Sequence, residues 1–174
     1  TMNFSVVSAN GKSVSGVLGN TFSFSGNSVG TVTIVKTGTI TNPSIGQQNA
    51  VIGKFRVTAG NENAEIQRLR LKINNAIDHK VYALYQGSDK VADGVYASGD
   101  YVDFAFSSPY TIAEGNSRNF DLKATVGGQA AETISVAMDR DTDMVVVGGD
   151  FGFNQAITRS GYDGSTAAGT EDDA

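Results

Sequence analysis

Between residues 54 and 147, apolar and polar side chains alternate with a period of two. This spacing places successive side chains on opposite faces of a strand, so it predicts strands that bury one face. Residues 68–73 show it clearly, whereas Ile66 falls on the opposite parity and predicts a bulge near Gln67. Alternating or continuous apolar runs predict further strands at residues 31–36, 54–59, 81–85, 102–106, 120–124, 134–138 and 144–147.

Turn signals separate these strands at short intervals. Pairs such as Thr37-Gly38, Asn42-Pro43 and Gly60-Asn61 recur along the chain, and strands at this spacing are typical of antiparallel sandwiches and barrels. We therefore expect an all-β, Ig-like antiparallel β-sandwich of about eight or nine strands with an extended N-terminal arm. We assign residues 1–30 to the arm and a first edge segment, 31–157 to the sandwich and 158–174 to an acidic C-terminal tail.

The composition excludes several classes of protein. The formal net charge is −5, with 18 acidic residues against 13 basic ones, and this balance argues against a nucleic-acid-binding surface. No apolar run approaches the roughly 18 residues of a membrane span, so we expect no membrane insertion. The chain contains no Cys, which excludes disulfides, thiolate metal sites and a Cys nucleophile.

Predicted strands and turns alternate at short, regular intervals from about residue 30 to residue 157. The segments that show this alternation most clearly are 51–59, 61–71, 81–87, 110–115 and 120–124. They resemble Ig-like β-sandwich modules of exported bacterial surface proteins, which occur in S-layer-like or filament-forming chains. The resemblance implies a structural protein that is secreted, extracellular or on the cell surface, and it does not extend to the arm or to the acidic tail.

Opposite charges collect in two regions. Residues 54–80 hold six bases and three acids, and residues 139–174 hold eight acids and two bases. Opposed patches suit a head-to-tail contact between identical subunits, although polar strand faces carry charges in any case. The predicted basic face consists of Arg68, Arg70 and Lys72, and its predicted partner consists of Glu171, Asp172 and Asp173.

Apolar residues also recur within the N-terminal arm. An extended arm can add as a strand to the edge of a neighbouring subunit, or it can supply the first strands of its own domain. We expect strand addition, and hence a structural subunit or module of an extracellular filament or surface layer, built as a homo-oligomer or polymer. The predicted apolar plugs are Phe4, Val6, Val14 and Val17.

One acidic segment has the spacing of a calcium loop. Asp139, Asp141 and Asp143 alternate, and Asp150 stands at the twelfth position counted from Asp139. Oxygen ligands at this spacing suit Ca²⁺, but Met144 occupies the place of the usual loop glycine. The alternatives are a Ca²⁺ that locks the loop and a solvated acidic turn between two strands.

A second interpretation is an adhesin or carbohydrate-binding β-sandwich module stabilised by that Ca²⁺. Its aromatic platform would use Tyr82, Tyr85, Tyr96, Tyr101 and Tyr110, although aromatic residues in strands are ordinary core material. His79 is the single histidine of the chain, and we expect it on the surface. Because no Gly-x-Ser-x-Gly elbow accompanies it, we expect no enzyme.

Overall fold

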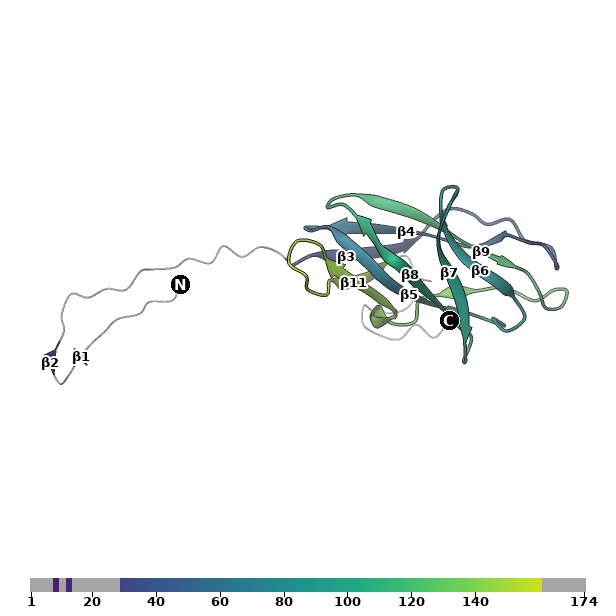
Figure 1. The fold of residues 1–174 in the computed structure, drawn as a ribbon. Helices are drawn as coiled ribbons and strands as arrows, with labels where there is room; N and C mark the ends of the chain where they lie inside the picture. The colour runs from purple at the N-terminus through teal and green to yellow at the C-terminus, as the bar shows by residue number, and fades with distance from the viewer. Residues whose placement is uncertain (1–7, 10–11, 14–28, 161–174) are drawn as a thin grey trace.

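The computed structural model describes residues 8–9, 12–13 and 29–160. Two short strands, β1 (Ser8–Ala9) and β2 (Lys12–Ser13), form a separate antiparallel pair. All the other strands of the described residues belong to one sheet (Figure 1). These strands are β3 (Thr31–Lys36), β4 (Ala50–Gly60), β5 (Ala64–Ile73), β6 (Lys80–Gln86), β7 (Asp89–Ala97), β8 (Tyr101–Ile112), β9 (Ser117–Thr125), β10 (Val136–Ala137), β11 (Met144–Gly148) and β12 (Ala156–Ser160).

The sheet is a single, strongly curled half-barrel of mixed direction. Its strands follow the order β10-β5-β8-β7-β6-β9-β4-β3-β12, and β11 also pairs with β5. Every pairing is antiparallel except that of β12 with β3, which is parallel. The all-β prediction is confirmed. The Ig-like antiparallel β-sandwich is wrong, because one unbroken hydrogen-bonded path joins the strands of residues 29–160 and leaves no second sheet there to face the first.

The buried side chains of successive strands form one continuous core. Phe55 of β4 stacks on Phe120 of β9 with ring centroids 5.4 Å apart, and Tyr110 of β8 meets Phe120 edge-on at 5.3 Å. Such aromatic pairs add to the free energy gained by burying apolar area. A curled sheet therefore buries one face of each strand against itself, which gives the same period-two pattern as two facing sheets.

The two ends of the half-barrel approach each other through a few hydrogen bonds. The backbone N–H of Gln155, just before β12, donates to the carbonyl of Val146 in β11 at 2.9 Å. Within β12, the Arg159 guanidinium donates to the carbonyls of Met138 and Asp139 at 2.8 and 2.7 Å. These contacts satisfy backbone groups near the two ends of the sheet.

The predicted elements agree with the structure in most places. The register between β5 and β8 shifts between Ile66 and Arg68, which confirms the predicted bulge. The strand expected at residues 134–138 shortens to β10, and β12 continues to Ser160, inside the segment assigned to the tail. Among the described residues, the structure contains no helix with the length and hydrophobicity needed to cross a membrane.

Candidate functional site

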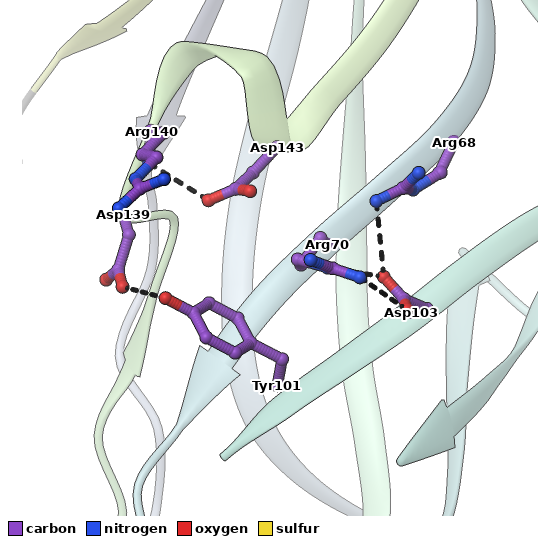
Figure 2. A network of polar contacts seen from close by, with 7 residues as sticks. All are labelled: Arg68, Arg70, Tyr101, Asp103, Asp139, Arg140 and Asp143. Atoms are coloured by element: carbon purple, nitrogen blue, oxygen red, sulfur yellow. Dashed lines mark hydrogen bonds and ion pairs between the residues drawn. The ribbon is translucent and has the colours of Figure 1, made fainter. Parts of the chain in front are cut away.

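The arginines of the predicted basic face have an acidic partner within the chain. Arg70 of β5 lies directly opposite Asp103 of β8 and donates to both of its carboxylate oxygens, at 2.7 and 2.9 Å (Figure 2). Arg68 approaches the same carboxylate at 3.7 Å. The hydrogen bonds from Arg70 hold the pKa of Asp103 below its ordinary value and raise the pKa of Arg70.

Lys72, the third basic residue, pairs with the acidic segment predicted to bind calcium. Its Nζ lies 3.4 Å from Oδ2 of Asp139. The Tyr101 hydroxyl donates to the same oxygen at 2.6 Å, as Figure 2 shows. The hydrogen bond to Asp139 raises the pKa of Tyr101. Oδ1 of Asp139 is buried without a partner among the described residues. Part of the charge predicted for contacts between subunits is thus neutralised inside one chain.

The other predicted calcium ligands turn toward separate partners. Residues Asp141–Asp143 form a short 3-10 helix, η1, in which Asp143 accepts the backbone N–H of Arg140 at 3.0 Å, while Asp141 pairs with Arg159 at 2.8 Å. Burial raises the pKa of Asp143. Asp150 lies beyond the far end of β11, and its side chain accepts a hydrogen bond from Asn63 at 3.3 Å.

These four carboxylates are not brought together as the calcium prediction required. Within residues 29–160, no group of three or more His, Cys, Asp or Glu side chains is placed to hold a metal ion. The solvated acidic turn is not observed either, because Asp139 and Asp143 are buried. The reason is local: η1 and the following strand separate carboxylates that are close in sequence.

The predicted contact residues of the arm and the tail lie outside the described residues, so their roles stay predictions. They are Phe4, Val6, Val14, Val17, Glu171, Asp172 and Asp173. The tyrosines proposed as a sugar platform do not share one role. Tyr82 is buried, Tyr110 packs on Phe120, Tyr101 binds Asp139, and Lys123 lies over the ring of Tyr85.

His79 was expected on the surface, but it is buried. Its Nδ1 accepts the backbone N–H of Gly127 at 3.1 Å, so the neutral ring carries its proton on Nε2. Nε2 has no hydrogen-bond partner in the described part of the chain. A side chain at position 127 would overlap the carbonyl of Asp78, which explains the glycine there.

A cavity of about 720 Å³, open to solvent on one side, lies beside His79, and its lining mixes apolar residues with polar ones such as Asn75, Gln129 and Glu132. Ile52, Val126 and Ile134 form part of its wall, and Ile40 and Ile45 contribute exposed apolar side chains. The segments that follow β3 and β9 line the cavity, at the end of the sheet where β5 also finishes. Sequence reasoning missed it, because the segments that form it are distant in the chain.

A buried carboxylate organises the opposite end of the sheet. Glu62, only 1% exposed, lies in the turn between β4 and β5. Its Oε1 accepts the backbone N–H groups of Asp150 and Phe151 at 3.1 and 2.9 Å, and its Oε2 accepts that of Gly30 at 3.3 Å. Glu62 therefore joins the start of β3 to the loop between β11 and β12.

That loop presents two phenylalanines to solvent. Phe151 is 49% exposed and Phe153 is 69% exposed. Backbone hydrogen bonds hold the loop closed: the N–H of Gly152 donates to the carbonyl of Gly148 at 2.9 Å, and the N–H of Gly148 donates to that of Phe153 at 2.8 Å. Together with Glu62, these bonds fix the backbone that carries both rings.

No protein-family model matches the sequence, and no curated protein is significantly similar to it.

Proposed function

We propose that this chain is a structural subunit or module of an extracellular filament or surface layer, and that its folded part bears tension. The parallel pairing of β3 with β12 carries the proposal. The register places Thr31 beside Ala156 and Val35 beside Ser160. The described chain therefore enters β3 at one end of this strand pair and leaves β12 at the other.

A force between the two ends of the domain acts along both strands. It loads their interstrand hydrogen bonds in shear, so several bonds must break together before the strands slide apart. A force across the end of the pair would break the same bonds one at a time. Breaking several bonds together has a higher energy barrier than breaking them one by one, so it slows unfolding. Because forced unfolding is governed by the unfolding rate, the shear geometry resists tension better. Glu62 reinforces it by accepting the N–H of Gly30, where the chain enters β3.

Composition supports an extracellular location. The chain has 21 Gly, and only 18% of its residues are charged, below the roughly 25% of ordinary soluble domains. Its strand-and-turn rhythm resembles that of surface-protein modules, although the fold differs from theirs. Arg70 and Lys72 pair with acidic residues of the same chain. These charges therefore hold the sheet together, as a load-bearing role requires.

Single-molecule force spectroscopy tests the load-bearing role. A polyprotein of the full chain is pulled first through its two termini, which loads β3 and β12 in shear. It is then pulled between the C-terminus and a cysteine introduced by Lys36→Cys, at the end of β3 beside Ser160. Because the chain has no other Cys, the attachment is unique.

We expect a several-fold higher unfolding force through the termini than through the Lys36→Cys attachment, which peels β12 from its end. Equal unfolding forces in the two geometries would show that the strand pair bears no special load. Thermal unfolding of the Lys36→Cys variant, compared with the unmodified chain, checks that the substitution leaves the fold intact.

A further inference from the structure

The two ends of the sheet carry complementary apolar features. Gly148, just before the loop with Phe151 and Phe153, pairs with the first residue of β5, and Val136, just after the cavity wall, pairs with its last residue. The ten-residue length of β5 separates the two features, which is about 30 Å at the usual rise of a strand. One end carries the exposed phenylalanine rings, and the other carries the cavity.

The size of the cavity suits the projecting side chains. The volume of the open cavity, about 720 Å³, is several times that of a closed cavity that binds benzene, roughly 150 Å³, so two phenylalanine rings can enter it while its mouth faces solvent. Its wall includes Ile45, Ile52 and Ile134, which offer apolar contacts to such rings. The projecting loop is fixed by Glu62 and by its own backbone bonds, so little conformational entropy is lost when it docks.

We propose that Phe151 and Phe153 of one copy insert into the cavity beside His79 of the next copy. This inference deepens the proposed function, on which it rests, by naming the partner as a second copy of this chain and naming both contact surfaces. The surfaces differ and lie at opposite ends, so the contact is heterologous, and repeated contacts of this kind build an open filament. The filament axis then follows the strands that bear tension.

The buried area predicts a weak individual contact. A fully buried aromatic side chain covers roughly 150–250 Å², and only the exposed parts of Phe151 and Phe153, 49% and 69%, remain to be buried. The contact is therefore at the small end of protein interfaces. Association should therefore depend on concentration, and it should strengthen when copies are held in an array, where the effective concentration is high.

Sedimentation velocity of the full chain over a range of concentrations tests the contact. One variant removes the projection with Phe151→Ala and Phe153→Ala, and a second places a charge in the cavity wall with Ile45→Glu. The matched control is Val95→Ser in β7, because Val95 is 69% exposed, as Phe153 is. Thermal unfolding of each variant checks that it is folded, and Phe153→Lys is a single-substitution alternative if the double variant is not.

We expect the unmodified chain and the control to form concentration-dependent oligomers, and both end variants to remain monomeric. Mixing the two end variants should then give dimers and nothing longer, because only one intact projection and one intact cavity remain to meet. Monomers at every concentration, oligomers that survive both substitutions, or a mixture without dimers would each overturn the contact.

Oligomers that survive the substitutions at both ends but disappear when residues 1–20 are deleted would assign assembly to the N-terminal arm instead. None of these results depends on the force measurement. A failed end-to-end contact leaves the load-bearing role of the strand pair standing, and equal unfolding forces in the two pulling geometries leave the contact standing.

Discussion

At the scale of single residues, the contact between Arg70 and Asp103 joins β5 to β8 through two charge-assisted hydrogen bonds. Asp103→Asn removes the charge and one strong acceptor, so we expect the free energy of unfolding to fall by about 1 kcal/mol near neutral pH. The matched control is Asp93→Asn, which breaks the more exposed pair with Lys90 and should have a smaller effect. Urea denaturation of each variant measures both changes.

The pH dependence of the Asp103→Asn effect follows from the same contact. The folded-state pKa of Asp103 lies below its unfolded value. Its stabilisation is therefore present above the unfolded pKa and is lost as the pH falls through the folded pKa. The stability difference between the Asp103→Asn variant and the unmodified chain should shrink in acid. A difference that stays constant into strong acid would contradict the role assigned to the pair.

Tyr82 gives the opposite dependence on pH. Burial raises its pKa, with further increases from Asp100 and Asp78, and its hydroxyl donates to the carbonyl of Ala76 at 2.7 Å. The stabilisation from neutral Tyr82 is complete below the ordinary tyrosine pKa and is lost as the pH rises through the higher folded value. We therefore expect Tyr82→Phe to cost about 1 kcal/mol at neutral pH and to reduce the loss of stability in alkali.

Urea denaturation of the Tyr82→Phe variant across the alkaline range measures this effect. Tyr85→Phe is the matched control, because Tyr85 lies on the same strand and uses its ring, which the substitution keeps, to contact Lys123. An alkaline profile that is the same in the Tyr82→Phe variant and in the unmodified chain would show that another group controls stability there.

Sequence patterns identified the charged residues but not their partners. Arg68, Arg70 and Lys72 stand out as a basic face because they are close in sequence, whereas Asp103 lies on a strand whose position depends on long-range pairing. Glu62 carried no signal beyond a place near a turn, and only the folded sheet brings it to Gly30 and Phe151. The positions of the strands and the face on which each side chain lies were therefore predictable from the sequence. Contacts between distant strands were not.

At the scale of elements, Glu62 connects the turn between β4 and β5 to β3 and to the loop before β12. Glu62→Gln keeps one acceptor but replaces the other carboxylate oxygen with a donor that faces a backbone N–H. We expect it to lower the free energy of unfolding by about 1.5–3 kcal/mol, because hydrogen bonds to charged groups are among the stronger ones.

Hydrogen exchange at Gly30, Asp150 and Phe151 provides a local measurement, since these amides donate to Glu62. Their protection should fall more than that of amides in the central strands. Glu65→Gln, three residues further along and without an equivalent set of donors, should change stability by less than about 0.5 kcal/mol. Unchanged protection of the three amides in the Glu62→Gln variant would disprove the connecting role.

Predicted strands correspond to observed strands because apolar and polar side chains alternate along a strand in any fold that buries one face of a sheet. The bulge at Gln67 was predictable for the same reason, since a slip in parity must be absorbed locally. The number of sheets was not predictable, because facing sheets and a curled sheet bury alternate residues equally well. Nothing in Ala156–Ser160 indicates a parallel partner, yet its pairing with β3 sets the direction in which the chain crosses the molecule.

At the scale of the whole molecule, the response of assembly to salt separates an apolar end contact from a charged one. With a formal net charge of −5, identical copies repel one another at low ionic strength. Raising the salt from about 0.1 M to about 1 M shortens the Debye length from about 10 Å to about 3 Å. This screening removes the repulsion but leaves the burial of Phe151 and Phe153 intact, so we expect sedimentation of the full chain to show more association at high salt.

A contact based on opposite charges would respond in the other direction. The predicted pairing of Arg68, Arg70 and Lys72 with Glu171, Asp172 and Asp173 would be screened and would weaken as salt is added. The Phe153→Lys variant provides the control, because it should not gain association at high salt if the rings form the contact. Oligomers that dissolve as the ionic strength rises would favour the charged contact, because hydrophobic burial does not weaken under those conditions.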